Sequence, residues 1–129
     1  MITKVWNISR IVAVAMVFAL AMPSGTLMAQ SALNQNIAAT VSGLSANDKA
    51  IKSFYQARNF APMWVGSKNR KRRKALLDAL NDASDHGLPE TSYRVAELKS
   101  AVNKSRSNEA MAVAEVIATK AFLAYAQDI

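Results

Sequence analysis

Six basic side chains within seven residues form the strongest candidate binding surface of this sequence: Lys68, Arg70, Lys71, Arg72, Arg73 and Lys74. Such a cluster attracts phosphates, anionic lipid or the acidic groups of a cell wall. The alternative is a solvated helix start, at some cost because bases oppose the dipole at a helix amino terminus. No aromatic residue interrupts the run, so it does not suit the stacking of nucleic-acid bases. The sequence therefore predicts either a patch for anionic surfaces or a solvated helical turn.

A second group that could do chemistry is Asp82, Asp85 and His86, spaced so that one helix brings the three close together. Carboxylates beside a histidine can bind a metal ion or transfer protons. No other histidine and no cysteine is present to complete a metal site. We therefore interpret the group as a solvated helix end and predict no metal.

This sequence lacks the residues that nucleophilic catalysis usually requires. There is no cysteine, only one histidine, and no G-x-S-x-G, S-x-x-K or phosphate-binding loop motif. We therefore expect no catalysis by this chain alone, and no cofactor.

Residues 1–29 resemble a secretory signal peptide, and the alternative is an uncleaved anchor or a buried core helix. A short start with Lys4 and Arg10 precedes an uncharged apolar run over residues 11–22, which is too short to span a bilayer. Cleavage is predicted after Ala29, with Ala32 as the alternative. We therefore expect a periplasmic or otherwise exported protein that contacts the membrane only through its signal peptide before cleavage. Despite the net charge of +7, nucleic acid is not an expected partner.

The rest of the chain predicts an all-α fold with about three main helices. Residues 30–45 are small and polar and are interpreted as a flexible leader. Helical spacing of apolar residues predicts helices over about 46–58 and 69–86, the second ending at Gly87 before Pro89. An extended piece over 63–65 separates them.

The carboxyl-terminal third is predicted to hold a turn, one short helix with Tyr93 and Leu98 facing inward, and a polar loop over 103–107. Asn108 is the expected cap of a third long helix, from about 109 to the end. Its predicted apolar face consists of Met111, Ala114, Ile117 or Ala118, Ala121, Phe122 and Tyr125. This pattern carries no stop signal, so we expect either a frayed helix or the front part of a longer protein.

Seven aromatic residues follow the predicted signal peptide: Phe54, Tyr55, Phe60, Trp64, Tyr93, Phe122 and Tyr125. They suit either a groove for carbohydrate or peptide, or an ordinary core. Most lie on faces predicted to point inward, so we favour the core.

Three ordered motifs resemble the scaffold domain of large periplasmic L,D-transpeptidases. Residues 54–66 read Phe-Tyr-Gln-Ala-Arg-Asn-Phe-Ala-Pro-Met-Trp-Val-Gly, and residues 75–93 run from Ala-Leu-Leu-Asp-Ala-Leu through Asp-His-Gly-Leu-Pro to a tyrosine. The third motif, Ala-Glu-Val-Ile-Ala-Thr-Lys-Ala-Phe-Leu-Ala-Tyr-Ala-Gln-Asp, covers residues 114–128. The resemblance extends over about 46–129.

This resemblance implies a supporting part of an enzyme that joins peptidoglycan stem peptides through a cysteine acyl-enzyme. The family's catalytic and peptidoglycan-binding domains have no counterpart in this sequence, and no cysteine follows His86-Gly87. We therefore expect a truncated scaffold domain over 46–129 that would meet peptidoglycan only through the missing parent domains. The competing hypothesis is a small secreted basic helical protein that binds an anionic cell-wall polymer or membrane surface through residues 68–74. The sequence does not define an oligomeric state.

Overall fold

The computed structural model describes residues 24–129, and the predicted signal peptide lies mostly outside this range. Five α-helices form the described chain: α1 (Ser24–Ser42), α2 (Lys49–Ala57), α3 (Arg70–Asn81), α4 (Val95–Lys104) and α5 (Asn108–Asp128). Short 3-10 helices, η1 to η4, cover Ala46–Asp48, Ser67–Asn69, Asp82–His86 and Glu90–Tyr93. No strand occurs between residues 24 and 129. The all-α prediction is confirmed, with five main helices in place of about three.

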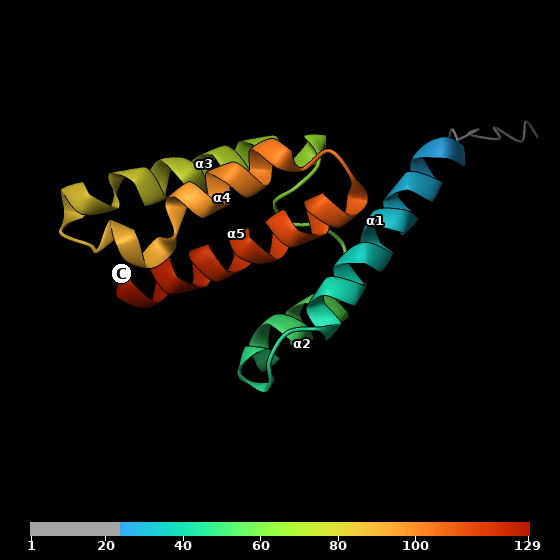
Figure 1. Cartoon of the computed structure of the whole chain (residues 1–129), viewed down its shortest axis with the longest axis horizontal. Coiled ribbons are helices and arrows are strands. Elements are labelled where there is room, and N and C mark those ends of the chain that lie inside the picture. Colours follow the sequence, from blue (N-terminus) through green and yellow to red (C-terminus); the bar gives the residue numbers. More distant parts are fainter. Residues whose placement is uncertain (1–23) are drawn as a thin grey trace, which may run out of the picture.

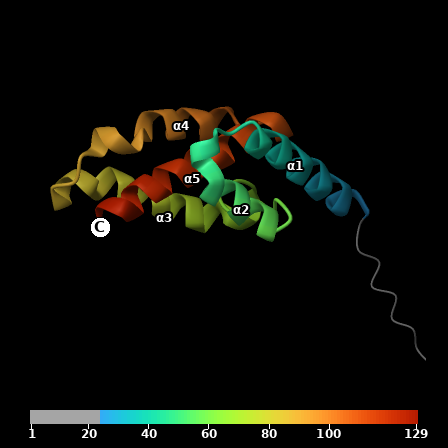
Figure 2. The ribbon, with the colours of Figure 1, turned by 90° about the horizontal axis from the view of Figure 1, so that it is seen from below.

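Helix α5 is the central element of the structure. Figure 1 shows α3 and α4 running along one side of α5, while α1 and α2 lie toward its amino-terminal end. In the view from below in Figure 2, α5 is seen between α4 and α3, and α1 leads away from the other helices toward its amino terminus. Because α5 packs against elements on both sides, the buried residues near its middle lie between two parts of the molecule.

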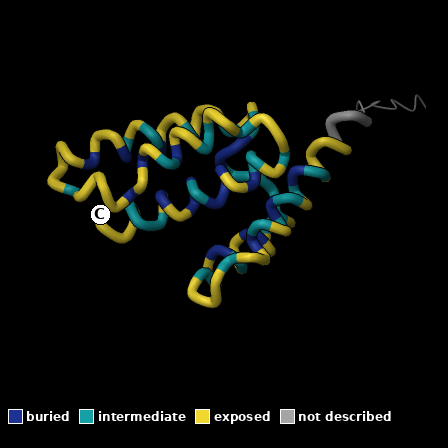
Figure 3. The backbone as a smooth tube through the Cα atoms, viewed as in Figure 1, coloured by how far each residue is buried: buried dark blue, intermediate teal, exposed yellow. Residues whose placement is uncertain are grey.

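The core consists of two apolar clusters that meet along α5. One cluster joins α1 and α2 to Ala112, Ala114 and Val116, and the other joins α3 and α4 to Ala118 and Ala121. Small alanine side chains let the neighbouring helices approach α5 closely. Figure 3 shows buried residues along the inner sides of the helices and exposed residues along the outer sides.

The interpretation of residues 30–45 as a flexible leader was wrong for residues 30–42, which belong to α1. Leu33, Ile37 and Val41 recur every four residues and are buried against the first cluster. The pattern was missed because the positions between them are mostly small or polar, so the contrast between the two faces is weak. The predicted cleavage point after Ala29 falls within this helix, ahead of Leu33.

The two predicted helices in the middle of the chain are confirmed, with 3-10 turns at their ends. The first begins as η1 and continues as α2, and the second runs through α3 and η3 to His86. Gly87 then adopts a left-handed conformation with φ of 73°, which glycine reaches without steric cost. Residues 63–65, predicted as an extended piece, form a bend in the link between the two helices.

Two predictions about the last third required correction. The short helix is the ten-residue α4, which extends into the predicted loop to Lys104, although Tyr93 and Leu98 are buried as expected. The cap of α5 is Ser107 and not Asn108, because the Ser107 hydroxyl accepts a hydrogen bond from the Ala110 amide at 3.2 Å. An extended residue before the first helical turn is better placed to reach that amide.

The predicted apolar face of α5 is only partly buried. Ala114, Ala118 and Ala121 are buried, whereas Phe122 is 38% exposed. Met111, Ile117 and Tyr125 are half-buried. The helix also buries two polar residues that the pattern did not predict, Glu115 and Thr119.

Candidate functional site

The carboxylate of Glu115 lies at the centre of the molecule with none of its residue surface exposed. Its Oε1 accepts hydrogen bonds from the Met63 amide at 2.5 Å and the Tyr55 hydroxyl at 2.7 Å. Its Oε2 accepts from the amides of Trp64 and Val65, each at 2.9 Å. No lysine or arginine among residues 24–129 forms an ion pair with it. Four donors from one loop and one helix therefore replace a salt bridge.

Thr119 extends this polar network by one helical turn. Its hydroxyl accepts from the Trp64 indole Nε1 at 3.0 Å, donates to the Glu115 carbonyl at 3.1 Å and lies 2.6 Å from the Tyr55 hydroxyl. Burial raises the pKa of Tyr55 well above its usual range, and the nearby charge of Glu115 raises it further. Tyr55 therefore stays protonated in the folded protein and can donate to the carboxylate.

The other side of the same link is held by residues of the predicted basic patch. Arg73 Nη1 donates to the Trp64 carbonyl at 2.7 Å, and Arg72 Nη1 donates to the Met63 carbonyl at 3.0 Å. The amides of residues 63–65 thus face an acid, while carbonyls of the link face bases. This arrangement pairs each end of the peptide dipoles with a charge of opposite sign.

The six bases between Lys68 and Lys74 therefore divide into two groups. Arg72 and Arg73 hold the 63–66 link, and Lys74 forms an exposed ion pair with Asp78 at 2.6 Å. Lys68, Arg70 and Lys71 are exposed, and no hydrogen bond or ion pair joins them to another described side chain. Only this second group is available to a ligand without loss of an internal contact.

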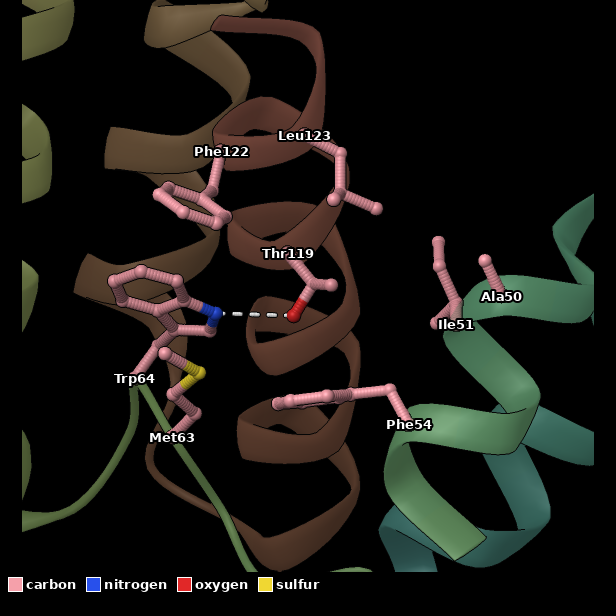
Figure 4. A pocket seen from close by; sticks show the side chains of 8 residues that line it. All are labelled: Ala50, Ile51, Phe54, Met63, Trp64, Thr119, Phe122 and Leu123. Atoms are coloured by element: carbon pink, nitrogen blue, oxygen red, sulfur yellow. Dashed lines mark hydrogen bonds between the residues drawn. The ribbon is translucent and has the colours of Figure 1, made fainter. Parts of the chain in front are cut away.

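An apolar pocket of about 270 Å³ opens between α2, the 63–64 link and α5. Figure 4 shows Ile51 and Phe54 of α2 facing Trp64, Phe122 and Leu123. Its polar lining group, the Thr119 hydroxyl, is already bonded to the Trp64 indole. The pocket is therefore suited to apolar groups.

The aromatic residues divide between the core and this pocket. Tyr55, Trp64 and Tyr93 are buried, as the core interpretation predicted, and Phe60 and Tyr125 are half-buried. Phe54 and Phe122 are each 38% exposed and flank the pocket. The Trp64 and Phe122 ring centroids lie 5.4 Å apart.

The group formed by Asp82, Asp85 and His86 lies exposed on η3. Among residues 24–129, no three acidic or histidine side chains are placed to hold a metal ion. The helices of the same range also include none that is long and apolar enough to cross a bilayer.

A tyrosine of the second sequence motif binds the carboxyl-terminal end of α5. The Tyr93 hydroxyl donates to Asp128 Oδ2 at 2.7 Å, and the Tyr93 and Tyr125 ring centroids are 5.6 Å apart. Burial, together with the hydrogen bond to Asp128, raises the pKa of Tyr93 to about 12. This bond joins the second and third motifs.

A comparison with protein families matches the Scaffold domain over residues 49–129. This chain belongs to the Scaffold domain family. The match is consistent with the scaffold domain of L,D-transpeptidases that the three motifs resemble. Searches of curated proteins and of solved structures found no match.

The residues that the family motifs bring together are those of the Glu115 network. The first motif supplies Tyr55 and the 63–65 link, and the third supplies Glu115 and Thr119. The sequence pattern did not predict this network, because the inward face of α5 was predicted from its apolar residues alone. The sequence nevertheless contains a signal for buried polar residues in α5. An acid and a threonine four residues apart interrupt a run of small and apolar residues.

Proposed function

We propose that this chain is the amino-terminal scaffold portion of an exported L,D-transpeptidase, which supports peptidoglycan cross-linking without performing the chemistry. The observation that carries the proposal is the Glu115 network, in which residues of the first and third motifs serve to hold the fold together. The acyl-enzyme step of such a reaction needs a cysteine, and this chain has none. Another polypeptide segment would have to supply it.

The proposal is tested by muropeptide analysis of cells that lack the chain. We expect fewer stem peptides joined by L,D-transpeptidation, and restoration by the intact gene but not by Glu115→Gln. Glu90→Gln, at an exposed position, is the matched control and should restore the profile. An unchanged profile in the deletion strain would overturn the proposal, as would cross-linking catalysed by the purified chain itself.

Export is part of the same proposal and needs its own measurement. The expected product in the periplasmic fraction begins at Gln30, which leaves the buried residues Leu33, Ile37 and Val41 in place. Amino-terminal sequencing of that product gives the cleavage site. Recovery of the chain only in the cytoplasm, with residue 1 intact, would contradict it.

The second candidate function is binding of an anionic cell-wall polymer through Lys68, Arg70 and Lys71. The observation that favours it is the exposure of these three bases beside three others that already have partners. We expect binding to isolated sacculi that weakens as salt increases. Replacing the three bases with glutamine should abolish it.

The matched control removes the same charge elsewhere, by changing the exposed Lys49, Lys99 and Lys104 to glutamine. Equal loss in both triple variants would show that net charge alone matters, and would exclude a defined patch. Binding to anionic vesicles but not to sacculi would point to lipid and would also overturn the cell-wall proposal.

A further inference from the structure

The wall that Trp64 forms in the pocket between α2 and α5 is held in place by its contacts. The backbone of Trp64 is bound on both sides, by Glu115 at its amide and by Arg73 at its carbonyl, and its indole is bound by Thr119. Phe122 packs on the same indole. A cavity whose walls are already ordered loses little conformational entropy when it is filled.

The pocket size matches side chains better than a whole small molecule. Its volume of about 270 Å³ is below the range of roughly 300–1,000 Å³ typical of ligand pockets. Phe54 and Phe122 remain partly exposed at its edge, so an occupant would remove aromatic surface from water. One or two large apolar side chains would satisfy these conditions.

The charged side chains next to the pocket lining are three bases, Arg58, Arg72 and Lys120, and two acids, Asp48 and the buried Glu115. The Arg58 guanidinium carbon lies 5.0 Å from the centroid of the Phe54 ring, and Arg72 is bound to the carbonyl of Met63. Lys120 follows Thr119 in α5 and pairs with Asp48, the acid next to α2, at 3.3 Å. An occupant with carboxylates beside its apolar side chains would therefore be favoured over one with bases.

We propose that this pocket is a docking site for an acidic amphipathic segment of a partner protein, which inserts leucine-like side chains between Phe54 and Phe122. The surrounding charge disfavours a second copy of this chain docked pocket to pocket, because the two basic pocket edges would then face each other. The inference rests on the pocket alone and does not depend on the proposed scaffold function.

The test uses the full chain with Trp6→Phe, which leaves Trp64 as the single tryptophan and as a reporter inside the pocket. The probe is a short synthetic peptide with two leucines flanked by glutamates. We expect a saturable change of Trp64 fluorescence. Matched peptides have lysines in place of the glutamates, or serines in place of the leucines, and should bind at least about tenfold more weakly at low salt.

Ala50→Phe fills the pocket from the exposed side of α2 and should weaken peptide binding at least about tenfold. Ala39→Phe places the same ring at an exposed position on α1 and should leave binding unchanged. Circular dichroism confirms that both variants are folded.

Three results would overturn the proposal. The first is equal binding of the acidic and basic peptides, and the second is equal binding by Ala50→Phe and Ala39→Phe. The third is absence of peptide binding together with a dimer in sedimentation that Ala50→Phe dissociates, which would assign the pocket to a second copy of the chain.

Discussion

At the scale of single residues, Glu115 shows how a buried charge is accommodated without a countercharge. Removing a carboxylate from water is costly unless hydrogen bonds replace those to water. Three consecutive amides and a tyrosine hydroxyl do so here, at distances between 2.5 and 2.9 Å. The three amides belong to a link with no regular secondary structure, so the same carboxylate also satisfies backbone groups that would otherwise lack partners.

Glu115→Gln should therefore destabilise the protein strongly. The amide has one oxygen to accept hydrogen bonds, and its NH₂ group would face amides that are also donors. Leaving buried donors unsatisfied costs about 1–3 kcal/mol each, so we expect a loss of at least about 2 kcal/mol in the free energy of unfolding. Urea unfolding followed by circular dichroism measures it. Glu90→Gln is the control, and equal stabilities of the two variants would contradict the role of the network.

The positions of some residues could be predicted from the sequence, but the burial of Glu115 could not. Tyr93, Leu98 and Gly87 were predicted correctly because local spacing and the helix stop signal identify them. Glu115 could not be found in this way, since its backbone donors lie 50 to 52 residues earlier. A glutamate in mid-helix ordinarily points to solvent, and only the folded chain shows the donors that reverse this rule.

At the scale of secondary-structure elements, α1 shows how weak patterning hides a real helix. Its buried face is built from Leu33, Ile37 and Val41, one residue per turn, and the helix packs against α5 and α2. A stripe this narrow is sufficient because the facing residues of α5 include alanines, which allow close approach. The sequence of α1 does not reveal what it faces, so its burial could not be predicted from its own pattern.

Truncating Ile37 tests whether α1 is a structural part of the fold. Ile37 has no exposed surface, and replacing a fully buried isoleucine by alanine costs about 2–5 kcal/mol. We expect Ile37→Ala to lower the midpoint of urea unfolding by a corresponding amount, while Gln35→Ala, at an exposed position of the same helix, has little effect. If the two variants unfold alike, α1 is not packed on the core in solution.

At the scale of the whole molecule, a polar network lies where the two apolar clusters meet. Val65 belongs to the cluster of α1 and α2, whereas its neighbour Trp64 belongs to the cluster of α3 and α4. The Glu115 network lies between them and binds the amides of both residues. The two clusters are therefore joined by hydrogen bonds of a specific geometry as well as by apolar contact.

Alkaline pH should destabilise the folded molecule through its buried tyrosines. The pKa of Tyr93 is raised from 10.0 to about 12, and that of Tyr55 is raised further. Because the folded state holds these protons more tightly than the unfolded state, their contribution to stability is complete below pH 10 and declines as the pH rises toward 12.

Unfolding free energies measured across this pH range should therefore fall more steeply for the native chain than for Tyr93→Phe. The ultraviolet absorbance of ionised Tyr55 and Tyr93 should appear together with the loss of helical circular dichroism. Ionisation of both residues in a chain that remains helical would contradict the expectation.

The position of Glu115 also has a consequence for the rate of unfolding. Helices α4 and α5 are neighbours in the chain and can pair after closing a short turn, whereas the contacts of Glu115 require a loop of about fifty residues to close. We expect the network to form after the main folding barrier, so that Tyr55→Phe accelerates unfolding in stopped-flow experiments and barely changes the folding rate. A variant that instead slowed folding would place the network in the nucleus. If the expectation holds, this carboxylate governs how long the scaffold stays folded and has little influence on how fast it forms.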